Sequence, residues 1–76
     1  MRIEARSYAY LRKYTARLPG GDLEVPEGAT VEFVLNFLDV PEDLKKILLV
    51  NGRHVTENRV LSPGDVLVFY PVLEGG

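Results

Sequence analysis

Polar and apolar residues alternate along the start of the chain. A period of two places successive side chains on opposite faces of a strand, so this pattern predicts a half-buried strand over residues 2–8. Residues 8–14 are expected to lead out of it into a short turn. The Pro-Gly-Gly-Asp sequence at 19–22 is a strong turn signal, and residues 23–25 then predict a second strand. We expect these two strands to form an antiparallel pair.

A helical period follows Thr30. Apolar residues recur there at i, i+3, i+4 and i+7, which is one face of a helix. The hydroxyl of Thr30 suits the N-cap position, because it can accept a hydrogen bond from a free amide of the first turn. Pro41 ends the helix, and residues 41–46 predict one more short helical turn. The face consists of Val31, Val34, Leu35 and Leu38, with Phe33 and Phe37 extending or flanking it.

The second half of the chain predicts strands again. Residues 47–50 are a continuous apolar run, as expected for a central strand. Asn51-Gly52 is the preferred pair for a type I′ hairpin turn, because both positions need a positive φ. Residues 53–55 are then the short return strand. A tight turn at 62–65 precedes the last strand, which we expect over 66–70 with Pro71 ending it.

The order of elements is strand, strand, helix, strand, short strand, strand. A hairpin followed by one helix and more strands favours an α+β layer, with the helix across one face of a mixed sheet. The first and last strands are expected to lie side by side in parallel at its centre, which is the ubiquitin-like β-grasp arrangement. Residues 1–76 are predicted to be a single domain with a flexible tail from about residue 71.

The last strand is more apolar than this fold requires. One helix covers one face of the sheet, yet both faces of residues 66–70 are apolar. We expect Leu67 and Phe69 to point toward the helix. Tyr70 points away together with Val66 and Val68, while Tyr8 joins them from the neighbouring strand and His54 lies close. An uncovered apolar patch often marks a protein-binding surface, although exposed apolar area is also common without a function.

Composition and charge exclude several functions. The 76 residues include nine basic and eleven acidic side chains, for a net charge of −2, which argues against nucleic acid as a partner. There is no cysteine and hence no disulfide, thiolate metal site or cysteine nucleophile. His54 is the only histidine and supports neither a metal site nor a catalytic triad. No apolar run approaches membrane-spanning length and the start does not resemble a signal peptide, so we expect a cytoplasmic protein.

The sequence ends in Gly75-Gly76. Glycine has no Cβ, so two in a row make a thin, extensible tail whose carboxylate can enter a narrow tunnel. Such a tail suits a protein whose terminal carboxylate is the group on which another enzyme acts. The alternative is a frayed end without a function, since termini are commonly disordered. We expect the tail to be mobile in the free protein.

Several motifs, in this order, resemble those of the MoaD/ThiS sulfur carriers. They are an aromatic-Ala-x-x-Arg stretch at 8–12, Pro-Glu-Gly-Ala-Thr-Val opening the helix at 26–31, Val-Asn-Gly at 50–52, Gly-Asp-Val at 64–66, and Phe-Tyr-Pro-Val at 69–72 leading to the terminal glycines. The resemblance extends over essentially the whole chain.

The resemblance implies chemistry centred on the carboxylate of Gly76, with Gly75 beside it. An E1-like activating enzyme adenylates this carboxylate with ATP, and sulfur transfer then gives a thiocarboxylate. ATP belongs to the partner, so the chain itself binds no cofactor or metal and is not an enzyme. Its own contributions are a reactive end and a docking surface. The residues expected in that surface are Tyr8, His54, Val68, Tyr70 and Pro71.

Within the family, the tail is most similar to the molybdopterin synthase small subunit. The similarity implies that the large subunit of that synthase is a partner and that the sulfur serves molybdenum or tungsten cofactor synthesis. Val72 stands where the family pattern has a second proline, and Glu74 is an unusual charged neighbour of the glycines. Three alternatives remain: a sulfur carrier for thiamine thiazole or another pathway, a ubiquitin-like modifier that forms isopeptide bonds, and a β-grasp binding domain whose glycines are incidental.

Overall fold

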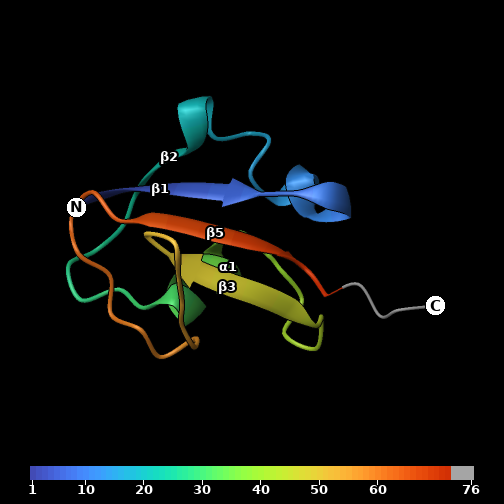
Figure 1. The fold of residues 1–76 in the computed structure, drawn as a ribbon. Coiled ribbons are helices and arrows are strands. Elements are labelled where there is room, and N and C mark those ends of the chain that lie inside the picture. Colours follow the sequence, from blue (N-terminus) through green and yellow to red (C-terminus); the bar gives the residue numbers. More distant parts are fainter. Residues whose placement is uncertain (73–76) are drawn as a thin grey trace.

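The computed structural model describes residues 1–72, which form a five-stranded mixed sheet and one α-helix (Figure 1). The expected mobile tail, apart from its first two residues, lies outside the described residues. Short 3₁₀ helices, labelled η, connect the first two strands. In chain order, the elements are β1 (Arg2–Ser7), η1 (Ala9–Tyr14), η2 (Pro19–Gly21), β2 (Asp22–Glu24), α1 (Val31–Phe37), β3 (Lys46–Val50), β4 (Arg53–His54) and β5 (Val66–Pro71).

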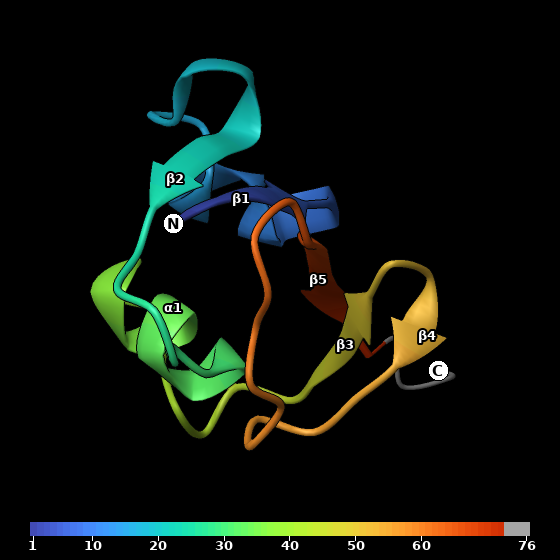
Figure 2. The same cartoon turned by 90° about the vertical axis from the view of Figure 1, so that its left-hand side faces the viewer.

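The strands lie in the order β2-β1-β5-β3-β4. The first and last strands pair in parallel at the centre, with Ala5 opposite Leu67 and Ser7 opposite Phe69. β2 pairs antiparallel with β1, and β3 pairs antiparallel with both β5 and β4. This confirms the predicted β-grasp topology. Figure 2 shows that α1 lies under one face of the curved sheet and leaves the other face uncovered.

The helix begins where the sequence predicts. The Thr30 side chain accepts a hydrogen bond from the amide of Phe33 at 3.1 Å, which is the expected N-cap contact. Val31, Val34 and Leu35 are buried against the sheet. The predicted second helical turn is wrong. Within the described residues, 41–44 form only a turn, closed by a 3.2 Å hydrogen bond from the Leu44 amide to the Pro41 carbonyl.

The core lies between α1 and the covered face of the sheet. Phe69 and Leu67 are fully buried at its centre, as predicted for the last strand. The phenyl rings of Phe33 and Phe37 flank the helix face and remain exposed. The other buried apolar residues are Ile3, Ala5, Leu11, Leu23, Val25, Ala29, Val31, Val34, Leu35, Leu38, Val40, Leu48, Val50 and Leu61.

The segment after β1 differs from the predicted strand end and turn. The strand ends at Ser7, Ala9 takes a φ of 55°, and residues 9–14 then form the 3₁₀ helix η1. Leu11 is only 1% exposed and fixes η1 to the core. The buried Leu11 side chain therefore anchors residues 9–14 beside the ends of β1 and β5.

Pro71 is the last residue of β5, so the strand ends there as predicted and includes the proline itself. The proline can belong to the strand because the sheet does not need its missing N–H there. The Val66 carbonyl and the Val72 amide both bond to the β3 side, at 2.9 Å to the Asn51 amide and 3.4 Å to the Lys45 carbonyl. The backbone N–H and C=O groups of the odd-numbered residues of β5 therefore point toward β1. β1 has already ended at Ser7, opposite Phe69, so no partner is lost at the proline.

Replacement of Leu35 by alanine should destabilise the domain by roughly 2–5 kcal/mol, because the buried isopropyl group of leucine is lost and a cavity is left. Leu35 is 3% exposed in the core. The control is Asn36→Ala on the exposed side of the same helix, which should change stability by less than about 0.5 kcal/mol. Urea unfolding followed by circular dichroism measures both. Equal losses in the two variants would show that the helix faces are misassigned.

A second prediction concerns Gly20 and Gly21, which both have a positive φ. A Cβ at Gly21 would lie 2.9 Å from the Ala5 carbonyl oxygen, whereas a Cβ at Gly20 would meet nothing within 4 Å. Gly20→Ala should therefore cost only the backbone strain of about 1–2 kcal/mol. Gly21→Ala should cost about 1–3 kcal/mol more, as for other overpacked sites. The same urea assay compares them, and a smaller loss for Gly21→Ala would contradict the described turn.

Candidate protein-docking face

The uncovered face of the sheet carries apolar side chains at its centre. Along β5, Leu67 and Phe69 are buried, while Val66, Val68 and Tyr70 are half-buried on the opposite side. This confirms the predicted assignment of the two faces. Because α1 packs under the other side, nothing in the described part of the chain covers Val68 and Tyr70 completely. Their partial exposure leaves a strand surface that a partner can bury.

β3 supplies two further residues that the sequence analysis did not identify. Ile47 lies opposite Tyr70 and Leu49 lies opposite Val68, and both are half-buried. We call these four residues the apolar strip. The apolar run at 47–50 predicted a strand but did not show that only Leu48 and Val50 face the core. The alternation of strand side chains, together with one helix for two faces, was the signal available.

Polar side chains border the apolar strip on both edges. Arg6 on β1 lies opposite Val68, and His54 on β4 lies opposite Leu49, so one row of side chains crosses four strands. His54 is exposed and close to the strip, as predicted. Tyr8 is 48% exposed, and its amide donates to the Phe69 carbonyl at 3.3 Å, which holds it beside the end of β5.

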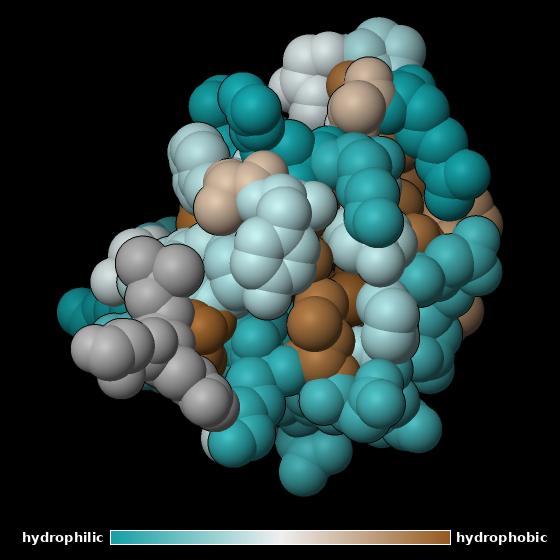
Figure 3. Space-filling view, turned by 90° about the vertical axis from the view of Figure 1, so that its right-hand side faces the viewer, coloured by the Kyte–Doolittle hydropathy of each residue, from teal (hydrophilic) through white to brown (hydrophobic). Residues whose placement is uncertain are grey.

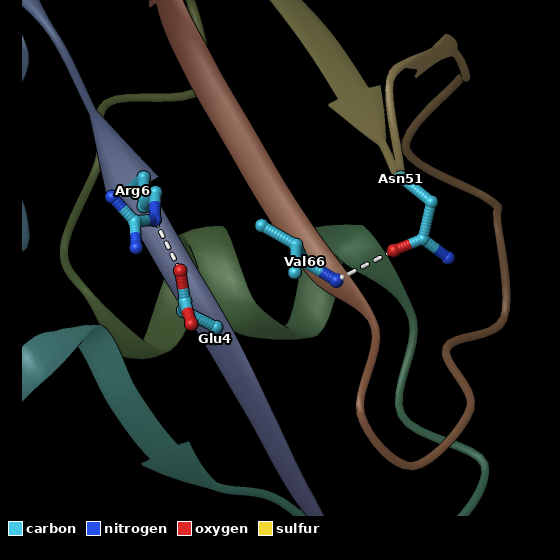
Figure 4. Close-up of polar contacts among 4 residues, drawn as sticks. All are labelled: Glu4, Arg6, Asn51 and Val66. Atoms are coloured by element: carbon cyan, nitrogen blue, oxygen red, sulfur yellow. Dashed lines mark hydrogen bonds and ion pairs between the residues drawn. The ribbon is translucent and has the colours of Figure 1, made fainter.

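Arg6 is held by its neighbours on β1. Its Nε donates to the carboxylate of Glu4 (Figure 4). This hydrogen bond, the negative charge of Glu4 and a weaker hydrogen bond with Tyr8 raise the pKa of Arg6 above its ordinary value. The guanidinium lies at the edge of the strip and is positively charged, as arginine side chains in proteins are. Aromatic and arginine side chains are the types enriched in protein interfaces.

Pro71 does not belong to this face, although the sequence analysis placed it there. It is buried on the same side as Leu67 and Phe69, because one step along a strand reverses the side-chain direction. The resemblance grouped it with Tyr70 by sequence order and missed this reversal. Gly75 and Gly76, the expected reacting end, lie outside the described residues.

The turn after β3 aligns the start of β5 with the strip. Asn51 and Gly52 have φ values of 52° and 83°, as a type I′ turn requires. The Asn51 side chain accepts a hydrogen bond from the Val66 amide at 2.9 Å (Figure 4) and donates to the Asp65 carboxylate at 2.9 Å. Asp65 also accepts from the Ser62 amide at 2.8 Å. These contacts fix the register in which Val68 faces Leu49.

Apolar atoms are also exposed at the end of the sheet where β5 ends. Figure 3 views this end and shows small brown areas between teal side chains. Val72 is 39% exposed there. Over residues 1–72, no three acidic, histidine or cysteine side chains gather in a way that could hold a metal ion. That part of the chain also has no helix with the length and apolarity to span a membrane.

Comparison with known proteins places this geometry in a family. The model of the ThiS family matches residues 8–76. No curated protein matches the chain. Among solved structures, SAMP1 from Haloferax volcanii has a TM-score of 0.77 at 20% identity, and the match covers 100% of both chains. A second structure, of H. volcanii small archaeal modifier protein 1, has a TM-score of 0.75 at 19% identity. The match covers 95% of the present chain and 98% of that one.

A third structure comes from Pyrococcus furiosus and is described as molybdopterin converting factor, subunit 1. It has a TM-score of 0.75 at 22% identity, and the match covers 96% of this chain and 99% of that one. Identities of this size show the shared fold. The three similar structures and the family match therefore agree on a β-grasp, ubiquitin-like domain.

Proposed function

We propose, since the chain belongs to the ThiS family of ubiquitin-like sulfur carriers, that it carries sulfur as a thiocarboxylate on Gly76. The main support for this proposal is that a member of this family also has an uncovered apolar strip on its sheet. The strip serves as the docking surface for an E1-like activating enzyme. The chain acts as a co-substrate of its partners, which supply the active sites.

The chemistry follows from the poor reactivity of a carboxylate. In the first step, a Gly76 carboxylate oxygen attacks the α-phosphorus of ATP, which forms an acyl-adenylate and releases pyrophosphate. In the second step, hydrosulfide attacks the acyl carbon and the C–O bond to AMP breaks, so that AMP leaves and one sulfur replaces one oxygen without any change of oxidation state. The activating enzyme supplies ATP binding and charge stabilisation. The carrier must therefore hold the enzyme by another surface while its end reacts.

The apolar strip has the composition that such a surface needs. Tyr70 and the flanking Tyr8 each offer a ring that buries area and a hydroxyl that can find a polar partner. Arg6 and His54 stand at the edges of the strip, where a polar rim usually surrounds an apolar centre. Because β5 contributes both Tyr70 and the residues that lead to the chain end, a partner bound on the strip is also close to the start of the tail.

The acceptor pathway that we propose is molybdopterin synthesis, with the large subunit of molybdopterin synthase as second partner. Two observations support it. The residues 69–72 resemble the corresponding stretch of the small subunit. The structure from Pyrococcus furiosus described as molybdopterin converting factor, subunit 1, shares the fold over nearly the whole chain. Incubation of the thiocarboxylate form with candidate large subunits and a sulfur-free pterin precursor distinguishes this pathway from thiamine thiazole synthesis.

A second candidate function is protein modification, in which Gly76 forms an isopeptide bond with a lysine of a target. The similarity to small archaeal modifier protein 1 favours it. Modification needs the same adenylate, so both functions share the first step. Because Glu74 precedes the terminal glycines and the last basic residue is Arg59, cell proteins are digested with a protease that cleaves after glutamate. Mass spectrometry then finds Gly-Gly remnants on target lysines only if the chain is a modifier.

The end of the chain should be essential for loading and unimportant for folding. With the cognate activating enzyme, ATP and a sulfur donor, intact mass should show an adenylate and then the exchange of one oxygen for one sulfur. Protein prepared with a C-terminal amide should show neither product, because the reacting carboxylate is blocked. Its stability should match that of the acid form within about 0.5 kcal/mol. Sulfur gain by the amidated protein would place the chemistry at another residue.

Tyr70→Asp should block docking while the fold remains. Tyr70 is half-buried on the uncovered face, and a new carboxylate there opposes burial against a partner. We expect binding of the activating enzyme to weaken by at least about 2 kcal/mol, the scale of an interface hot spot, with a matching fall in sulfur loading. Titration calorimetry measures the first and intact mass the second.

The matched control is Tyr10→Asp, at a tyrosine that is 61% exposed on η1 and outside the apolar strip. It should leave enzyme binding unchanged. If both variants bind as tightly as the unaltered protein, the partner docks elsewhere. If Tyr70→Asp unfolds the domain, the side chain contributes to the core more than its exposure indicates.

A further inference from the structure

The outer side of α1 carries two aromatic rings that neither the core nor the apolar strip uses. Phe33 and Phe37 are 40% and 54% exposed. Their rings stack, with centroids 6.5 Å apart and planes inclined by 12°. An exposed aromatic pair of this kind is a small apolar patch, and patches rimmed by charge mark interaction sites more often than scattered apolar residues do.

The chain around these rings is acidic. Residues 26–44 contain five acidic side chains, all exposed, and no lysine or arginine. We call the rings and these side chains the acidic aromatic face. A partner with positive charge suits this segment, since like charges across an interface are costly. The five side chains are Glu27, Glu32, Asp39, Glu42 and Asp43.

The first 17 residues show the opposite charge. They contain five basic side chains and one acidic side chain, Glu4. On η1, Tyr10 is 61% exposed, and Lys13 lies on its side of the helix because positions i and i+3 coincide in a 3₁₀ helix. Arg12 and Arg17 are also exposed. We call Tyr10, Arg12, Lys13 and Arg17 the basic aromatic face.

The two faces are separated in one molecule. Figures 1 and 2 show η1 at the end of β1, on the sheet layer, and α1 below the covered face of the sheet. The two faces of one copy therefore cannot contact each other. They are complementary between copies, because they carry opposite charge and each has exposed aromatic surface, two rings on one face and one ring on the other.

We propose that the acidic aromatic face of one copy binds the basic aromatic face of a second copy. This contact joins different surfaces, so it is head-to-tail and leaves one face of each kind free at the two ends. Two or three partly exposed rings bury far less area than a permanent interface needs. The association is therefore weak, depends on salt, and leaves the apolar strip free for other partners.

The first test uses the unaltered protein. Amide chemical shifts are recorded over a range of protein concentrations, at salt concentrations of about 0.01 M and 1 M, where the Debye length is roughly 30 Å and 3 Å. At low salt, the amides of α1 and η1 should shift together with rising concentration. At high salt the association constant should fall by at least about tenfold, because the charge contribution is screened. Shifts confined to one of the two elements, or to the apolar strip, would overturn the proposal.

The second test reverses the charge of one face at a time. Glu27→Lys with Glu32→Lys and Glu42→Lys changes the acidic aromatic face from five negative charges to a net charge of +1. Arg12→Glu with Lys13→Glu changes the basic aromatic face from three positive charges to a net charge of −1. Each charge-reversed variant alone should lose the concentration dependence. An equimolar mixture should regain it, because each variant retains one natural face and the two altered faces are complementary. Sedimentation velocity measures association, and the amide spectrum confirms that each variant is folded.

The control is Arg53→Glu, an exposed basic residue on β4 outside both faces, which should self-associate as the unaltered protein does. Failure of the mixture to associate would refute the head-to-tail contact. So would undiminished association of the Arg12→Glu, Lys13→Glu variant, which would indicate a symmetric contact between two helices. If a charge-reversed variant does not fold, the shift mapping and salt dependence of the unaltered protein still decide the question.

Discussion

One short helix cannot cover both faces of a five-stranded sheet, and the rest of the molecule depends on this constraint. The seven residues of α1 bury one face, where Leu67 and Phe69 are inaccessible to water. The other face of β3 and β5 must then be polar or must find a partner. Its central residues Ile47, Leu49, Val68 and Tyr70 are apolar or aromatic and only half-buried. In the carrier role that we propose, this face binds the activating enzyme.

The strand that carries half of this strip also leads to the end of the chain. β5 is held on one side by parallel pairing with β1 and on the other by β3, and Asn51 and Asp65 fix the register at its start. Val68 and Tyr70 are thus presented on the central strand of the sheet. This arrangement separates two tasks that we propose for the protein: a rigid surface for recognition, and an end on which a partner acts.

Local signals predicted much of the fold because each has a short-range physical cause. Thr30 caps α1 and Asn51-Gly52 makes the β3–β4 turn, since a hydroxyl acceptor and two positive φ values act within a few residues. The features that the sequence did not predict depend on contacts between residues far apart in the chain. The 3₁₀ helix η1 depends on burial of Leu11, and Ile47 and Leu49 join the strip only through pairing with β5. Pro71 was assigned to the wrong face because sequence similarity does not show the direction of a side chain.

The most direct test of the account is to map the surface that the activating enzyme covers. The isotope-labelled chain is titrated with the cognate enzyme without ATP, and the loss of amide and methyl signals is followed residue by residue. We expect the signals of Ile47, Leu49, Val68 and Tyr70 to be affected first, while Phe33 and Phe37 on the far side of the domain keep their signals. Perturbation centred on α1, with the apolar strip unchanged, would contradict it.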